Sequence, residues 1–274
     1  MNMMTAKPTA QDFAADDLPL MLPGRPDMRY DFPKAWHHFK ELVKDKENTA
    51  EVAKIFEALP WRGAYDAAKA FLASARGQAI RKSEPSLVAI LDDHDRLRKM
   101  PKGSLAHAYC DFMEKEGLTA QGLVDEYEKF ADKTEKFDDL LERYGNRQRD
   151  THDLFHVLTG YGRDALGEQC VLAFTYSQNP NLGILFIAYA GGREIKKGLK
   201  NVPIYSAIRE AQRAGKAAQK IAHQDIRALL AEPLADARKR LGIKEPTQYN
   251  RAHEIMRAGG VDPYDLLGQQ KAAA

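Results

Sequence analysis

Apolar residues recur at three- and four-residue spacing in nearly every segment of this chain from Pro33 onward. That spacing places apolar side chains on one face of an α-helix. The segments are rich in Ala, Leu, Lys and Glu, and they are divided by Pro60, Gly63, Gly77 and Pro85. No stretch combines the alternating pattern of a β-strand with a hairpin turn. The sequence therefore predicts an all-α fold. Its expected helices include one within residues 85–100 and a long one from about Ile204 to Ala222.

Three regions are expected from the composition. Residues 1–30 contain several prolines and three aspartates within the first seventeen positions, which is typical of an extended arm. They show neither the basic and then apolar order of a secretory signal nor the Arg-rich pattern of a mitochondrial presequence, so no targeting peptide is expected. Residues 31–243 are predicted to form one helical domain, and residues 244–274 a C-terminal helical tail. Four apolar residues of the arm are expected to pack onto the domain: Leu18, Leu20, Met21 and Leu22.

The charge balance and the cysteines restrict the partners and the compartment. The 41 Lys and Arg residues nearly balance the 39 Asp and Glu residues, for a net charge of +2, which argues against nucleic acid as a partner. Cys110 and Cys170 do not suggest a disulfide framework, so a reduced, cytoplasmic setting is expected. The most apolar stretch, Leu182 to Ala190, is about half as long as a membrane span, so no transmembrane segment is expected.

The stretch from Arg147 to Glu168 carries residues with metal-ligand chemistry. If His152, Asp153 and His156 lie on one helix, His156 is about 40° and Asp153 about 100° around the helix from His152. The three side chains would then share one face of the helix. This half of a metal site needs further ligands from another element.

The turn after this helix is expected to bring the missing ligand into place. Gly160 and Gly162 favour a C-cap and a turn, so Glu168 would arrive on a second helix packed back on the first. The pattern HDxxH-x11-E then supplies two imidazoles and two carboxylates to a metal. The alternative is a histidine pair that lies at the surface or is hydrogen-bonded in the core. The metal is favoured because three apolar residues bury the helix behind the histidines, where polar groups need partners: Leu154, Phe155 and Leu158.

Several other polar groups are expected to have ordinary structural roles. Lys196, Lys197 and Lys200 are interpreted as a solvated helix end, with an anionic site for a membrane surface or a phosphate as the alternative. The run Asp92–Asp95 is explained by capping and solvation. The other histidines are expected at the surface or in hydrogen bonds: His37, His38, His107, His223 and His253.

The residues around the motif resemble a known family. The pattern RxRDxHDxxH with its downstream glutamate, the segment PKGSLAHAYCDFM and the terminal PLADARKRLGI are similar to the coenzyme Q (ubiquinone) biosynthesis protein 4 homolog family. The resemblance covers roughly residues 70–243. The chain departs from the family pattern at Gln148, where members usually have Tyr, and at residues 176–180, which replace a Thr-Gly-Leu-Pro-like turn.

The resemblance implies an all-α fold with a buried metal-binding helix pair. It assigns the metal ligands to His152, Asp153, His156 and Glu168, and the catalytic role to Glu168 and Asp153. It favours zinc as the divalent metal, and iron or cobalt are alternatives if oxygen is the oxidant. It further implies a polyprenyl lipid or ubiquinone precursor as ligand, peripheral association with the inner membrane, and other ubiquinone biosynthesis enzymes as partners. A homodimer is a further expectation.

Two functions follow from the resemblance as expectations. The first is metal-dependent oxidative decarboxylation of a polyprenylated hydroxybenzoate head group. The second is a non-catalytic lipid-binding scaffold that organises the ubiquinone biosynthesis enzymes. A third, an HD-type metal phosphohydrolase, lacks its upstream His and distant downstream Asp. A hydrophobic lipid groove is expected among the apolar side chains of two helices, with ordinary core packing as the alternative: Val171, Leu172, Phe174, Leu182, Ile184, Leu185, Phe186 and Ile187.

Overall fold

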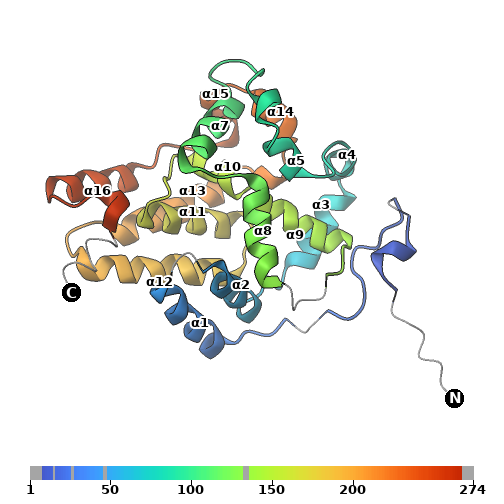
Figure 1. The fold of residues 1–274 in the computed structure, drawn as a ribbon, viewed down its shortest axis with the longest axis horizontal. Helices are drawn as coiled ribbons and strands as arrows, with labels where there is room; N and C mark the ends of the chain where they lie inside the picture. Colours follow the sequence, from blue (N-terminus) through green and yellow to red (C-terminus); the bar gives the residue numbers. More distant parts are fainter. Residues whose placement is uncertain (1–7, 15, 26–27, 46–47, 132–135, 267–274) are drawn as a thin grey trace.

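The computed structural model describes residues 8–14, 16–25, 28–45, 48–131 and 136–266 (Figure 1). Within these residues the chain forms one helical domain without a β-strand, which confirms the predicted all-α fold. Helices α10 and α11 lie near the centre, and the N-terminal helices α1 and α2 lie along α12 (Figure 1).

The first half of the chain forms mostly short helices, because Pro, Gly and capping Asp or Ser residues recur every ten to fifteen positions. Their bounds are η1 (Ala10–Asp12), α1 (Phe32–Lys44), α2 (Thr49–Ala58), α3 (Ala64–Ala73), α4 (Ala75–Ser83), α5 (Leu87–Leu91), α6 (His94–Leu97), α7 (Leu105–Glu116) and α8 (Ala120–Ala131).

The second half contains the motif and the longest helices. The bounds are α9 (Leu140–Asp150), α10 (His152–Thr159), α11 (Ala165–Gln178), α12 (Leu182–Gly198), α13 (Ile204–Ala217), η2 (Ile221–His223), α14 (Ile226–Ala231), α15 (Leu234–Leu241), α16 (Thr247–Ala258) and η3 (Pro263–Asp265). None of the helices in the described ranges combines the length and the apolar composition needed to cross a bilayer.

One helix is shorter than its sequence pattern indicates. The helix expected from about Ile204 to Ala222 ends at Ala217. Just beyond this end, the Gln178 side chain accepts a hydrogen bond from the N–H of Ile221 at 3.0 Å and donates one to the carbonyl of Gly215 at 2.6 Å. A partner from α11 thus satisfies backbone groups that a continued helix would have paired.

The acidic run Asp92–Asp95 divides a second expected helix into α5 and α6. The Asp93 carboxylate caps α6 by accepting from the N–H of Arg96 at 3.1 Å. The Asp92 carboxylate accepts from the N–H groups of Ala120 and Gln121 at the start of α8, at 2.7 and 2.9 Å. Both contacts agree with the capping role expected for this run.

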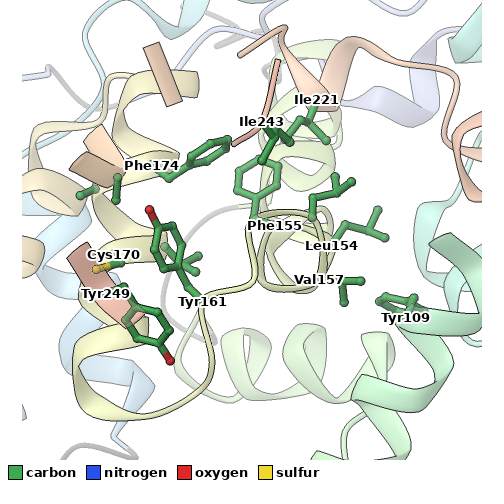
Figure 2. Close-up of a cluster of buried hydrophobic side chains, with 14 of the residues drawn as sticks. Tyr109, Leu154, Phe155, Val157, Tyr161, Cys170, Phe174, Ile221, Ile243 and Tyr249 are labelled. Atoms are coloured by element: carbon green, nitrogen blue, oxygen red, sulfur yellow. The ribbon is translucent and has the colours of Figure 1, made fainter. Parts of the chain in front are cut away.

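The main hydrophobic core surrounds α10, whose apolar side is fully buried as expected (Figure 2). The rings of Phe155 in α10 and Phe174 in α11 meet edge to face, with centroids 5.6 Å apart. The same core takes in side chains of α7, α13 and α16. This burial fixes the position of α10 and so determines where its polar side can point.

The N-terminal arm packs against the start of α9. Leu18 and Leu22 are buried and Leu20 packs onto a small core with Phe71 and Leu141, whereas Met21 is exposed, against the expectation. Met21 stays in solvent because successive residues of an extended segment point to opposite sides.

Backbone hydrogen bonds hold this arm in place. The N–H groups of Leu140 and Leu141 donate to the carbonyls of Pro19 and Leu20. The Asp139 carboxylate accepts from the N–H of Leu22 at 2.8 Å. It also pairs with the Arg25 guanidinium at 2.6 Å.

Six of the eight side chains expected to line a lipid groove contribute to two hydrophobic cores: Val171, Leu172, Phe174, Leu182, Phe186 and Ile187. Val171, Phe174, Ile184 and Ile187 are buried. The other members are only half-buried: Leu172, Leu182, Leu185 and Phe186. Much of the apolar surface of α11 and α12 is therefore taken up by ordinary packing, which was the alternative to a groove.

Close approach of α11 and α13 depends on a glycine. A Cβ at Gly215 would lie 2.4 Å from the carbonyl oxygen of Phe174, a distance at which something must shift. We expect Gly215→Ala to lower the free energy of unfolding by about 1–3 kcal/mol, the usual cost of overpacking. Gly145 in α9 has no atom within 4 Å of a built Cβ, so Gly145→Ala should leave stability unchanged or raise it slightly. Equal urea midpoints for the two variants would contradict this prediction.

Candidate metal centre

The C-terminal end of α10 is held by specific contacts. The helix ends at Thr159 because Gly160 adopts the left-handed conformation, with φ of 79°, as predicted for this glycine. The Arg238 guanidinium of α15 donates to the carbonyls of Val157 and Leu158, at 3.0 and 2.9 Å. These contacts satisfy carbonyls that the helix end would otherwise leave unpaired.

Glu168 lies in the first turn of α11, as predicted. Asp164 is the N-cap of this helix, and its carboxylate accepts from the N–H groups of Leu166 and Gly167, each at 3.1 Å. The N–H of Glu168 itself donates to the carbonyl of Asp164. The cap therefore fixes the place from which the Glu168 side chain extends toward α10.

Three of the four predicted ligands come together in space. His152 Nε2 lies 3.3 Å from His156 Nε2 and 3.9 Å from Glu168 Oε2, and His156 Nε2 lies 3.6 Å from the same Oε2. We call these atoms the donor triangle. Its three corners are about 2.1 Å from its centre, which is the usual length of a zinc bond to nitrogen or carboxylate oxygen. The donor set and its spacing therefore fit a divalent ion.

Asp153, the fourth predicted ligand, is not part of the donor triangle. Its side chain is buried, and it lies about 100° around α10 from His152, so it leaves the helix in a different direction. Its charge still influences both imidazoles.

The hydrogen bonds of His156 favour a state in which it can bind a metal. Its Nδ1 lies 2.9 Å from the carbonyl oxygen of Tyr161, and a carbonyl can only accept, so Nδ1 carries the proton. In the neutral ring, Nε2 then presents a lone pair to the donor triangle. The ring of Phe112 in α7 stacks on the imidazole of His156, with centroids 5.4 Å apart, and limits the rotation of the imidazole.

The protonation states of the three groups are coupled. Burial and the neighbouring His156 lower the pKa of His152. Burial alone would also lower the pKa of His156, but the charge of Glu168 and the Tyr161 carbonyl raise it overall. Burial opposes ionisation of Glu168, yet the two imidazoles and Arg163 hold its pKa below the usual value. The donor triangle thus presents an anionic carboxylate beside two imidazoles.

The donor triangle is reachable from solvent. The side chains of His152 and Glu168 are 26% and 30% exposed, whereas that of His156 is buried. Next to His156 lies a cavity of about 260 Å³, with aromatic side chains in its wall: Phe112, Tyr161 and Tyr264. Lys115 also lines this cavity, and its ammonium group lies 5.5 Å from the Tyr264 ring centroid. Of the three donor residues, His156 lines this cavity, whereas His152 and Glu168 do not.

A second group of ligand-type side chains was not predicted from the sequence as a set. His94, Cys110 and Glu114 meet between α6 and α7. The Glu114 carboxylate is held by the Arg98 guanidinium at 2.6 Å, and burial raises the pKa of the Cys110 thiol. A fixed positive charge and a protonated thiol make this group a poor cation site.

The other polar groups have structural contacts, as expected. His107 lies within hydrogen-bond distance of the carbonyls of Arg98 and Met100, His223 of the Tyr144 hydroxyl, and His253 of the Asp164 carboxylate. Lys196 donates to the carbonyls of Lys200 and Val202, and Lys197 pairs with Glu194 at 2.5 Å. These contacts fit a helix end better than an anion site.

Two residues that position the donors were missed by sequence reasoning. Tyr161 contributes only its carbonyl oxygen, which any residue could supply, so no sequence signal marks it. Asp164 could have been found, because an Asp directly before an apolar helical run is a capping signal.

The two departures from the family pattern meet in the structure. Asn179 belongs to the altered segment 176–180, and its side-chain amide lies 3.4 Å from Gln148 Oε1. Both residues are buried. They lie on α9 and at the end of α11, outside the donor triangle.

Comparison with known proteins gives a consistent result. A family model described as "Coenzyme Q (ubiquinone) biosynthesis protein Coq4" matches residues 41–247. A Pyricularia oryzae protein named "Ubiquinone biosynthesis protein COQ4, mitochondrial" is 26% identical over 185 residues, which cover 68% of this chain and 59% of that protein. A protein from Neosartorya fischeri with the same description is 24% identical, with coverages of 69% and 63%. The chain thus spans about three fifths of the length of these relatives.

A solved structure shows the same fold. The crystal structure of a Nostoc punctiforme protein, described as a "Putative ubiquinone biosynthesis protein", superposes on this chain with a TM-score of 0.56 and 20% sequence identity. The match covers 79% of this chain and 100% of that chain.

The cytoplasmic location expected from the sequence is contradicted by the Pyricularia oryzae and Neosartorya fischeri relatives, which are named mitochondrial proteins. The expectation was based on two cysteines without a disulfide framework and on the composition of residues 1–30. Free thiols are compatible with any reducing compartment, so they could not single out the cytoplasm.

Proposed function

Since this chain belongs to the Coenzyme Q (ubiquinone) biosynthesis protein Coq4 family, we propose that it acts in ubiquinone biosynthesis as a metal-dependent enzyme. The proposed reaction is oxidative decarboxylation of a polyprenylated hydroxybenzoate head group, in which the carboxyl group leaves as carbon dioxide and molecular oxygen is the oxidant. The observation that carries this proposal is the donor triangle, whose Nε2 and Oε2 atoms lie 3.3 to 3.9 Å apart.

His152, His156 and Glu168 would hold the divalent ion, whereas Asp153, the fourth ligand that the motif suggests, lies outside the donor triangle. Zinc is the first candidate, and iron and cobalt are alternatives. When bound, the ion would supply a Lewis acid that stabilises negative charge as the carboxyl group leaves. The Tyr161 carbonyl keeps Nδ1 of His156 protonated, so Nε2 stays free for the ion.

The cavity beside His156 is the proposed place for the aromatic head group. Its walls include Phe112 and Tyr264, which suit an aromatic ring. Lys115 also lines the cavity and suits a carboxylate or phenolate, although its ammonium group pairs with Glu116 at 3.2 Å. Its volume of about 260 Å³ is enough for a substituted benzene ring but not for a long prenyl chain. The chain of the substrate would therefore lie elsewhere on the protein.

Helix α1 supports the proposed contacts with lipid and with a membrane surface. Phe32, Trp36 and Val43 lie within about 40° of each other around this helix and are 52%, 42% and 45% exposed. Lys40 and Lys44 follow on the adjacent side of the same helix. An exposed apolar stripe beside lysines is typical of a helix that lies on an anionic bilayer.

The exposed stripe continues into α12, since the ring of Trp36 lies 6.1 Å from that of the half-buried Phe186. We propose that a prenyl chain reaches the protein along this apolar surface. The buried side chains of α11 and α12 would not need to separate for such contact.

Replacing Phe32 and Trp36 by Glu is expected to reduce binding to vesicles that contain anionic phospholipid by about tenfold or more, because each change removes apolar contact and adds repulsion. Co-sedimentation with vesicles measures this binding. The matched control is the exposed Tyr65→Glu on α3. Unchanged sedimentation of the double variant would show that α1 does not meet the membrane.

A turnover assay tests the proposed reaction directly. Purified protein is loaded with zinc, iron or cobalt and mixed in air with a short-chain prenylated hydroxybenzoate that carries a ¹³C-labelled carboxyl group. We expect release of labelled carbon dioxide that depends on the metal. If no metal supports release, the enzyme proposal fails. The alternative, a non-catalytic lipid-binding scaffold that organises other biosynthetic enzymes, is then favoured.

A further inference from the structure

Helix α16 lies against the turn that joins α10 to α11, and all of it after Thr247 is beyond the family match. Two of its buried side chains carry polar groups, Tyr249 and His253. Their rings pack together with centroids 4.2 Å apart. Tyr249 also meets the ring of Tyr161 edge to face, at 5.4 Å, and Figure 2 shows these two tyrosines near one another.

Both buried side chains contact Asp164, the N-cap of α11. The Tyr249 hydroxyl donates to Oδ2 of Asp164 at 2.5 Å, and His253 Nε2 lies 3.1 Å from its Oδ1. The same carboxylate accepts the N–H groups of Leu166 and Gly167. This carboxylate is buried, so its four partners replace water as the groups that stabilise its charge.

The Tyr249 hydroxyl has a second role at the turn. It accepts from the N–H of Gly162 at 3.0 Å. A Cβ at Gly162 would lie 2.4 Å from the Tyr264 hydroxyl and 3.0 Å from that of Tyr249, so this backbone is closely covered. One hydroxyl therefore links the turn residue Gly162 to the helix cap Asp164.

The turn held in this way contacts two residues of the donor triangle, His156 and Glu168. The Tyr161 carbonyl, next to Gly162, sets the orientation of His156. The N–H of Glu168 donates to the carbonyl of Asp164. A shift of the turn by a fraction of an ångström would move the Oε2 corner of the triangle relative to α10.

We propose that Tyr249 and His253 are positioning residues of the metal centre, which act through Asp164 and Gly162 without touching the ion. The proposal rests on the proposed metal centre. Residues after position 247, beyond the family match, would then help to position the metal ligands.

The test compares Tyr249→Phe with two controls in the full chain. The exposed Glu254→Gln changes the same helix, and Tyr65→Phe removes a hydroxyl on α3. Zinc affinity is measured by competition with a chromophoric chelator, and hydrogen exchange is followed by mass spectrometry at the amides of residues 162–167. We expect Tyr249→Phe to bind zinc about tenfold more weakly, in the range found for partners beyond the ligands, and to exchange faster at these amides. Both controls should match the unsubstituted chain.

The outcomes separate this proposal from the metal centre itself. Faster exchange with unchanged zinc affinity overturns it, because the contacts would then stabilise only the fold. If the unsubstituted chain binds no zinc, iron or cobalt, the proposed metal centre fails; unchanged exchange in Tyr249→Phe overturns the positioning role whether or not metal binds. If Tyr249→Phe does not fold, His253→Asn serves instead. The shorter Asn side chain does not extend to the position of the imidazole Nε2, so it loses the contact with Asp164.

Discussion

Replacement of His156 by Ala is expected to reduce the divalent metal in the purified protein from about one ion per chain to a trace. His156 Nε2 is one corner of the donor triangle, 3.3 Å from His152 Nε2 and 3.6 Å from Glu168 Oε2. Without it, only two donors remain within reach of an ion, which is too few for a stable site. The metal is measured by inductively coupled plasma mass spectrometry after dialysis against metal-free buffer.

The control for this variant is His37→Ala, because His37 is an exposed histidine on α1. It should keep the full metal content. Circular dichroism must show that His156→Ala is folded, since the lost ring also stacks on Phe112. Equal metal content in His156→Ala and His37→Ala would rule out the donor triangle as the metal site.

The second large effect is expected from Glu168→Gln in cells that lack the endogenous protein. The amide keeps the shape of the side chain, but it removes the negative charge that the low pKa of Glu168 secures. An ion held mainly by neutral imidazoles is bound more weakly and is less able to compensate charge in the substrate. We expect ubiquinone to fall by about 100-fold or more, if both binding and turnover suffer. The carboxylated precursor should accumulate.

Chromatography of the quinone and of its carboxylated precursor gives the result. Glu57→Gln is the matched control, because Glu57 is exposed on α2 and pairs with Lys34 at 3.6 Å, in a contact that is not buried. Full rescue by a folded Glu168→Gln protein would exclude the catalytic role and support the scaffold. Loss of ubiquinone without the precursor would place the defect at another step.

Helical periodicity and local signals in the sequence predicted much of the architecture. The all-α fold followed from apolar spacing, and the end of α10 followed from Gly160, whose φ of 79° suits a residue without a Cβ. The positions of His152 and His156 on one face of α10 also followed from their separation of four residues. These features depend on residues close in the chain, so the sequence contains their full cause.

The length of α13 and the packing of the apolar residues of α12 could not be predicted from such local signals. Gln178, from another helix, takes the Gly215 carbonyl and the Ile221 N–H near the end of α13. An apolar side chain such as Ile187 has the same pattern whether it faces a neighbouring helix or a lipid. Only the neighbours in space decide between these surroundings.

By itself, the sequence determined which residues of the candidate site could share a face of α10 and that Glu168 would lie on the next helix. The tertiary structure decided that Glu168 reaches His152 and His156 while Asp153 stays outside the donor triangle. The reason is that periodicity fixes angles within one helix, whereas a distance between helices depends on core packing and on hydrogen bonds between distant residues. The bond between Tyr249 and Asp164, 85 residues apart, is of this kind.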